Sequence, residues 1–227
     1  MRLLFQFLLT VLTIQISSYA FAGDEDVVIV KESPADSVVE NSSAHNRMNK
    51  KYSLTVMPIG FGPLNGIDSE INVGYFLDRK SIVSVRYNNL VKGNTCTGSL
   101  SCSDSGKAYG VSYKRFFGNS FYVNTAIDQR EISYSETQSD LGAGNYWFNF
   151  KGSSTIFSVV VGNQWQWKSF TLGCDWAGLG VPLAHQITNE NDSGDNAWSA
   201  SNRSDRETMY VSGSVAMALR FYLGASF

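Results

Sequence analysis

The sequence contains few charged residues, only four prolines and only two histidines. Charged residues make up 17% of the 227 positions, and 18 Lys and Arg face 20 Asp and Glu, so the chain lacks the basic excess of nucleic-acid-binding domains. After residue 22 no apolar run exceeds five residues, which excludes a further membrane-spanning helix, because such a helix needs about 20 apolar residues. Glycine, with 20 residues, and aromatic side chains, at 13%, are plentiful. The length suffices for one domain with a sizeable core.

The first 22 residues have the pattern of a secretory signal peptide. Arg2 supplies the basic start, an apolar stretch of about 14 residues follows at 3–16, and Ala20-Phe21-Ala22 forms the small-residue cleavage site. The stretch is too short for a membrane anchor. The residue directly after the cleavage site is Gly23 and not a cysteine, which excludes lipid attachment there. We therefore expect residues 1–22 to direct export and to be removed.

Residues 23–50 differ in composition from the remainder. An acidic opening at 23–26 precedes a stretch rich in Ser, Asn and Glu, interrupted by the apolar residues 27–30. Such a segment buries little apolar surface, so we expect a flexible acidic N-terminal segment at 23–50. The folded domain is expected to span residues 51–227.

From residue 51 onward, apolar and polar side chains alternate with the period of a β-strand. The second such segment places Ile67, Ile71, Val73, Tyr75 and Leu77 on one face. Eight strands are expected, approximately at 51–62, 66–77, 81–91, 107–117, 121–135, 150–166, 169–182 and 208–227. The last is long for a soluble sheet, whose strands usually have about 5–6 residues, and its length suits a strand that crosses a bilayer.

The expected last strand has one apolar face and one face of small and polar residues. The apolar face comprises Met209, Val211, Val215, Met217, Leu219, Phe221, Leu223, Ala225 and Phe227. Two prolines, Pro58 and Pro182, fall inside expected strands. Because proline removes a ladder hydrogen bond, we expect a β-bulge at each.

The connections between the expected strands alternate between short and long. Three short ones lie at 78–80, 118–120 and 167–169, and three long polar ones lie at 92–106, 136–149 and 183–207. Short turns on one rim and long loops on the other are typical of an outer-membrane barrel.

Aromatic residues gather at two levels along the expected strands. Near the short connections lie Tyr75, Phe76, Phe116, Phe117, Phe121, Tyr122, Trp165, Trp167, Phe170 and Phe227. Toward the long connections lie Tyr87, Tyr109, Tyr134, Trp147, Phe148, Trp176 and Tyr210. Amphipathic rings at two levels indicate two membrane–water interfaces, whereas a soluble sandwich or lipocalin-like barrel would place them in the strand middles.

This pattern resembles the small OmpA/OmpX-type outer-membrane barrels over residues 51–227. The resemblance is one of architecture and implies an all-β fold, an eight-stranded antiparallel up-and-down transmembrane β-barrel with its short turns in the periplasm. It also implies that Leu223, Ala225 and Phe227 form the signal read by the barrel-assembly machinery.

The function expected from this resemblance is that of an integral outer-membrane protein of a Gram-negative-type envelope. Its three long extracellular loops would serve a structural or surface-interaction role, and its partners would be outer-membrane lipids, lipopolysaccharide and the barrel-assembly machinery. The residues do not identify an extracellular partner. Two alternatives stay open, a barrel-embedded lipid-modifying enzyme and a soluble lipocalin-like binder of an apolar ligand.

If the apolar faces point to lipid, the opposite faces place seven charged residues inside the barrel. They are Glu70, Arg86, Lys114, Asp128, Arg130, Asp175 and Arg220. Such charges need the inward position, because a lipid-facing Lys or Arg near the bilayer midplane costs about 2–4 kcal/mol. We expect Asp175 to pair with Arg220, and the seven residues to interlock and plug the lumen. Arg115 falls on the lipid face and is expected to extend toward the nearby interface.

The three cysteines divide into a pair and a single residue. Cys96 and Cys102 lie six positions apart in one polar connection, and export would place them in an oxidising compartment, so we expect a disulfide between them. A metal site there is disfavoured because no histidine or third cysteine is near. Cys174 is expected to be a buried or lipid-facing thiol without chemistry.

Catalysis finds little support in the sequence. His185 is the only candidate base in the expected barrel, and no hydroxyl nucleophile or orienting acid lies near it along the chain. No phosphate-binding glycine motif is present either, since Gly60, Gly62 and Gly66 are not followed by a helix. We therefore expect no enzymatic activity, no cofactor and no metal.

Overall fold

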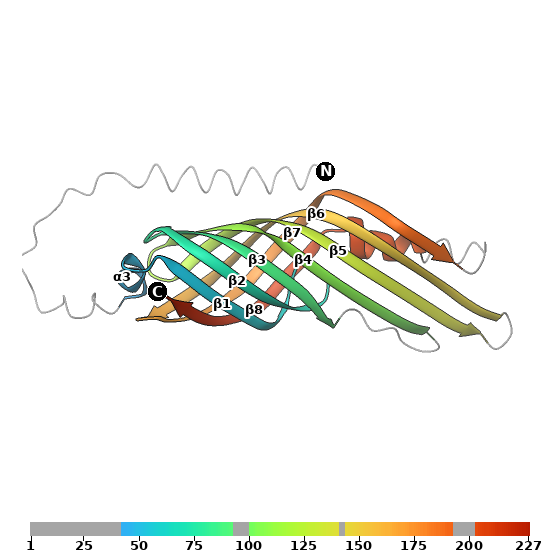
Figure 1. The fold of residues 1–227 in the computed structure, drawn as a ribbon, viewed down its shortest axis with the longest axis horizontal. Helices are drawn as coiled ribbons and strands as arrows, with labels where there is room; N and C mark the ends of the chain where they lie inside the picture. The colour runs from blue at the N-terminus through green and yellow to red at the C-terminus, as the bar shows by residue number, and fades with distance from the viewer. Residues whose placement is uncertain (1–41, 93–99, 141–143, 193–202) are drawn as a thin grey trace, which may run out of the picture. The chain divides into compact units, whose positions relative to one another are not determined.

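The computed structural model describes residues 42–92, 100–140, 144–192 and 203–227. They form the short helix α3 (Ser43–Met48) and eight strands that close into a barrel (Figure 1). The strands are β1 (Tyr52–Phe61), β2 (Ile67–Asp78), β3 (Ser81–Lys92), β4 (Leu100–Phe117), β5 (Phe121–Asp140), β6 (Gly144–Trp167), β7 (Phe170–Asp192) and β8 (Val215–Ser226). A helical turn, η1 (Thr208–Ser212), precedes β8. Within the described residues, no helix is both long enough and apolar enough to cross a membrane.

Each strand pairs antiparallel with the strand that follows it, and β1 pairs with β8 to close the ring. The seam ends on the last residue of the chain. The backbone N–H of Tyr52 donates to the Phe227 carbonyl at 2.7 Å, and the N–H of Phe227 donates to the Tyr52 carbonyl at 2.9 Å. The predicted eight-stranded antiparallel up-and-down barrel is therefore confirmed.

The two faces of the barrel wall differ as the alternation predicted. On the outside, Val73, Val85 and Val111 are each more than half exposed. On the inside, the intervening Ser84 and Arg86 of β3 are buried. The outer surface of the barrel is thus apolar over the part of the wall that β1, β2 and β3 span, and its interior is polar.

Strands β4–β7 are longer than predicted. They continue into the expected loops over residues 100–106, 136–140, 144–149 and 183–192, so the prediction of irregular loops is wrong for these residues. In the last part of β5 and the first part of β6 the alternation persists with its chemistry reversed, since Tyr134, Phe148 and Phe150 face inward while Ser133 and Ser135 face outward. Of these residues, only Phe148 lies in an expected loop. Polar outward residues made these segments resemble loops in the sequence.

We call the rim with the connections at 79–80, 118–120 and 168–169 the short-turn end. The opposite rim, where β4–β7 project beyond β1–β3, is the long-strand end (Figure 1).

The predicted last strand at 208–227 is wrong in its first part. Residues 203–212 are helical, and β8 begins at Val215. The predicted outward face is also wrong for Met209, Val211, Val215 and Met217, which lie inside the barrel, partly or fully buried. The inward and outward faces of β8 exchange between the buried residues Met217 and Arg220, at Leu219, whose φ is 51°. The pairing of β8 with β1 shifts register at the same place, between Phe221 and Ala218. From Leu219 onward the predicted faces hold.

Both proline bulges are confirmed. The pairing of β1 with β2 shifts register between Met57 and Gly60, around Pro58. The pairing of β6 with β7 shifts next to Pro182. Both prolines therefore lie where the ladder is already interrupted.

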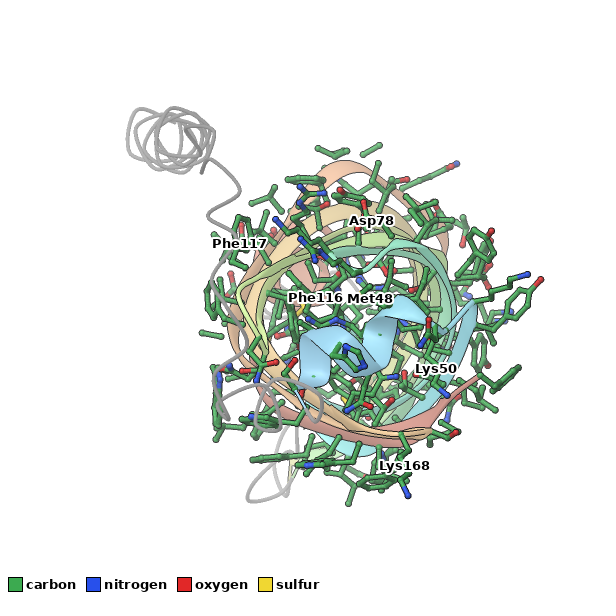
Figure 2. All side chains as sticks on the ribbon, turned by 90° about the vertical axis from the view of Figure 1, so that its left-hand side faces the viewer. Met48, Lys50, Asp78, Phe116, Phe117 and Lys168 are labelled. Carbon is green, nitrogen blue, oxygen red and sulfur yellow. The ribbon has the colours of Figure 1, made fainter. Side chains whose placement is uncertain are left out.

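The predicted flexible segment 23–50 is wrong for its last part. Ser42 caps helix α3, accepting a hydrogen bond from the His45 N–H at 3.1 Å. This helix lies across the short-turn end of the barrel (Figure 2). Serine at the cap position favours a helix start, which the polar composition did not suggest.

We predict that Gly224→Ala weakens the seam. A Cβ atom at this position would overlap the carbonyl oxygen of Leu54 in β1, and overpacking of this kind costs about 1–3 kcal/mol. Heat-dependent mobility on detergent gels measures barrel stability. Gly106→Ala is the matched control, because the nearest atom to its added Cβ would be Leu64 Cδ2 at 3.3 Å. Equal melting of both variants would contradict the prediction.

Candidate functional site

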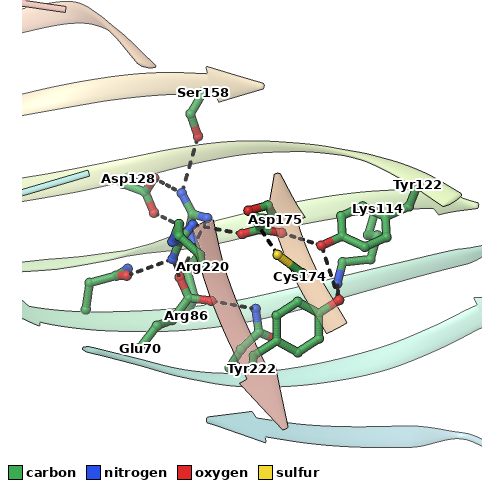
Figure 3. A network of polar contacts seen from close by, with 12 residues as sticks. Glu70, Arg86, Lys114, Tyr122, Asp128, Ser158, Cys174, Asp175, Arg220 and Tyr222 are labelled. Carbon is green, nitrogen blue, oxygen red and sulfur yellow. Dashed lines mark hydrogen bonds and ion pairs between the residues drawn. The ribbon is translucent and has the colours of Figure 1, made fainter. Parts of the chain in front are cut away.

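The centre of the barrel holds a network of buried ion pairs (Figure 3). The guanidinium of Arg86 makes two hydrogen bonds to the carboxylate of Asp128, one of 2.7 Å from Nε. It also donates to the Ser158 hydroxyl at 3.3 Å and lies 3.9 Å from Glu70 Oε2. Arg86 is 1% exposed and Asp128 is 0% exposed, so this pair is fully desolvated. Such a pair is stable only when both charges keep their partners.

Arg220 joins the network from β8. Its guanidinium pairs with Glu70 and contacts Asp175 Oδ2 at 3.2 Å. It also donates to Asn88 Oδ1 at 3.4 Å. The predicted contact between Asp175 and Arg220 is present, because the two residues are directly opposite in the β7–β8 register. Glu70 thus lies between two guanidinium groups.

Lys114 lies nearer the short-turn end, among aromatic rings. Its ammonium donates to the Tyr222 hydroxyl at 2.9 Å and to Gln164 Oε1 at 3.0 Å. It also lies 4.2 Å from the ring centre of Tyr122. The Tyr122 hydroxyl donates to Asp175, which links Lys114 to the network through neutral groups. Neither tyrosine was predicted as a partner, since Tyr122 was interpreted only as an interface aromatic and Tyr222 was not singled out.

Arg130 stands apart from the other six predicted charges. It donates to the Ser154 hydroxyl at 2.8 Å and to the carbonyl oxygens of Pro63 at 3.2 Å and Val211 at 2.8 Å. The expectation that all seven charges interlock is therefore wrong for Arg130. Its carbonyl partners come from the β1–β2 connection and from η1, whose positions the sequence did not reveal.

Helix α3 covers the interior at the short-turn end. The Arg47 guanidinium donates to the carbonyl oxygens of Arg79 at 3.1 Å and Asn119 at 2.9 Å, and it lies 3.8 Å from the ring centre of Phe116. Burial lowers the pKa of Arg47 to about 10, so the group stays charged at neutral pH. Sequence analysis missed Arg47, because a single arginine in a polar segment carries no periodic signal.

Two further contacts hold α3 against β6. The N–H of Gln166 donates to the Ser43 hydroxyl at 3.0 Å, and the Asn46 amide donates to the Gln166 carbonyl at 3.0 Å. These contacts place the helix against the barrel wall as well as against its opening.

The helical residues 203–212 fill the interior at the long-strand end. Tyr210 and Val211 pack in a buried cluster with Tyr134, Phe148 and Phe150 on the inner wall of β5 and β6.

Polar contacts fix these helical residues. Arg206 Nε lies 3.1 Å from Glu136 Oε2, the Tyr210 hydroxyl donates to Asp104 at 3.0 Å, and the Asn65 amide donates to the Met209 carbonyl at 2.9 Å. From the short-turn end to the long-strand end, the interior therefore contains helix α3, the aromatic layer around Lys114, the ion-pair layer around Arg86 and the aromatic layer around Tyr210.

The remaining predicted site residues have other positions. Leu223, Ala225 and Phe227 all face outward on β8 and at its end. Cys96 lies outside the described residues, so the disulfide with Cys102 stays a prediction. Cys174 is a buried free thiol.

His185 and Arg115 lie on the wall itself. His185 is exposed on β7. Arg115 Nη1 lies 3.9 Å from Asp78 at the short-turn end, as its expected reach toward the interface requires. Among the described residues, no group of three or more His, Cys, Asp or Glu is placed to hold a metal ion.

No family model and no curated protein matches the chain. Among solved structures, a major outer membrane protein from Thermus thermophilus is similar to it, with a TM-score of 0.48 and 13% sequence identity. That similarity covers 78% of this chain and 99% of the other.

We predict that Asp128→Ala destabilises the barrel by about 3–5 kcal/mol, because it leaves the buried Arg86 without its main counter-charge. The double variant Arg86→Leu/Asp128→Leu should lose much less, since replacing both charges by apolar groups leaves neither unpaired. Urea titration of the folded protein, followed by tryptophan fluorescence, gives the free energies of unfolding. A double variant at least as unstable as the single one would show that the ion pair is not the cause.

Proposed function

We propose that the chain is an integral outer-membrane β-barrel of the small OmpA/OmpX type, exported by residues 1–22. The observation that carries this proposal is the outward apolar surface. Large apolar side chains on all eight strands are exposed on the outside, whereas the buried charges Arg86, Asp128 and Arg220 face inward. A water-soluble barrel would be expected to have the reverse arrangement.

Exposed aromatic rings support two membrane interfaces. At the short-turn end the outward rings are those of Tyr52, Tyr75, Phe117, Phe121, Trp167, Phe170 and Phe227. Further along the wall, Tyr87 and Tyr109 lie opposite one another on β3 and β4 and are also exposed. Aromatic girdles at both interfaces are a property of such barrels. In this orientation the short-turn end and α3 face the periplasm.

The interior supports a barrel without an open pore. An eight-stranded barrel is only wide enough for side chains to fill. Here its length is occupied by the layer around Arg86 and Asp128, the layer around Lys114 and Tyr222, and helix α3 with its buried Arg47, which we call the Arg47 plug. The same filling disfavours a lipocalin-like binder, whose interior would be an apolar cavity.

The role we propose is structural or one of surface interaction. Strands β4–β7 have 18 to 24 residues, whereas β1–β3 have 10 to 12. About ten tilted residues span an apolar band of about 25 Å, so the longer strands project outside the membrane. Their polar outer face and the connections at their tips would meet outer-membrane lipids, lipopolysaccharide or an extracellular partner. The outward Leu223, Ala225 and Phe227 would meet the barrel-assembly machinery.

Membrane insertion is tested by expressing the full chain in a Gram-negative host and extracting the membranes with alkaline carbonate. We expect the protein in the outer-membrane pellet, with a mobility on detergent gels that changes on heating. Release into the soluble periplasmic fraction would refute the proposal.

Closure of the lumen is tested by conductance in planar bilayers. We expect no large steady conductance from the wild-type protein, nor from Arg47→Ala, because the central layers stay filled when the plug is loosened. A large steady current through the wild-type protein would show that the lumen is open.

The proposed role involves no catalysis. His185→Ala should therefore leave the lipid composition of the host outer membrane unchanged relative to wild type. A lipid modification that appears with the wild-type protein and disappears with His185→Ala would favour the lipid-modifying enzyme instead.

A further inference from the structure

A groove of about 570 Å³ lies on the outer wall of the barrel toward the long-strand end. Residues of β3 to β7 line it, among them Tyr87, Lys107, Glu131, Lys151 and Thr188. The groove is separate from the filled interior, since its lining side chains alternate with inward ones such as Arg130. None of the layers described above uses it.

Two lysines line the groove, and they differ in whether their ammonium group is paired with a carboxylate. Lys107 Nζ lies 3.1 Å from Glu131 Oε2, and both side chains are about half exposed. Lys151 is exposed and makes no ion pair with any described residue. The other lining groups include the neutral polar side chains of Asn89, Ser105, Gln129, Ser133, Ser153 and Thr188. Thr188 already donates to the Lys151 carbonyl at 3.0 Å and Asn89 to the Leu90 carbonyl at 3.4 Å, so the serine hydroxyls and the Gln129 amide are the donors that remain. One uncompensated cation among hydroxyl and amide donors is a setting that favours a tetrahedral anion with several acceptor oxygens.

The position of the groove specifies where such an anion would come from. Lys107 and Glu131 each lie ten residues from the strand ends Phe117 and Phe121. At about 3.3 Å per residue and a tilt of about 40°, this is about 25 Å along the axis, the height of the apolar band. Lys151 lies farther toward the long-strand end, opposite Ser133.

The wall on the membrane side of the groove is apolar. Tyr87 lines the groove, and Val85 and Val111, two positions closer to the short-turn end than Tyr87 and its partner Tyr109, are 63% and 54% exposed. A molecule with an acyl chain against these valines would bring its headgroup to the lysines.

We propose that this groove binds the phosphate of an anionic lipid in the outer leaflet, with Lys151 as its main contact. The proposal rests on membrane insertion as proposed above. Lys107 contributes less, because Glu131 already pairs with it. Glu131 limits the affinity, since it is the one carboxylate among the lining residues.

The test uses the full-length exported protein in nanodiscs of phosphatidylcholine with a small fraction of phosphatidylglycerol. Native mass spectrometry after release from the discs measures the phosphatidylglycerol retained. We expect Lys151→Gln to lower retention about tenfold, the effect of losing one charge-assisted contact. Lys107→Gln should lower it less, and Glu131→Gln should raise it.

Lys80→Gln is the matched control, because Lys80 is an exposed lysine at the short-turn end. Retention that is equal in wild type and Lys151→Gln, or lowered as much by Lys80→Gln, would overturn the site. Soluble glycerol phosphate is added in a parallel arm. Competition by it as effective as that by the lipid would identify free phosphate as the ligand and overturn the lipid assignment.

Vesicle flotation of each variant separates this proposal from the one on which it rests. Variants that float with vesicles but show no lipid selectivity would contradict the site alone. A wild-type protein that does not float would contradict membrane insertion, and with it the site.

Discussion

The pairing of Arg86 and Arg220 with Asp128, Glu70 and Asp175 is the constraint on which the rest of the structure depends. Because the outer surface of the barrel is apolar, the charged side chains lie in the interior. The interior is too narrow to hold bulk water around these charges. Each guanidinium must then meet a carboxylate or another acceptor. This requirement fixes the registers of β2, β3, β5, β7 and β8 relative to one another. A one-residue slip of any of these strands would turn its charged side chain outward.

The barrel wall has two regions, which differ in whether apolar or polar side chains face outward. In the region of Val85 and Val111 the apolar side chains face outward and the charges inward. Toward the long-strand end of β5 and β6, Tyr134 and Phe148 face inward and pack on Tyr210, while serines face outward. The same strands thus have a lipid-type surface over one part of their length and a surface typical of a soluble protein over the other, and the change occurs within continuous hydrogen-bonded ladders.

The sequence predicted the number of strands, their order and the inward face, because alternation is a local property that each strand displays by itself. It predicted the contact of Asp175 with Arg220 for the same reason. It did not predict that polar side chains face outward and aromatic ones inward where β4–β7 project beyond the end of β3. Polar outward residues in this region look like loop residues. Nor did it reveal the exchange of faces at Leu219, where φ is 51°, or the docking of Arg47, whose partners are carbonyl oxygens of distant turns.

The hydrogen bonds between Tyr52 and Phe227 join the first strand to the last residue of the chain. They belong to the pairing of β1 with β8, and every other pairing in the ring connects consecutive strands, so this pairing alone must bring together segments separated by the whole domain. The loop that this pairing closes is the longest in the ring, so its loop-closure entropy is the largest. No smaller set of consecutive strands therefore has all its edges paired, and the two outermost strands keep open edges until β1 and β8 meet.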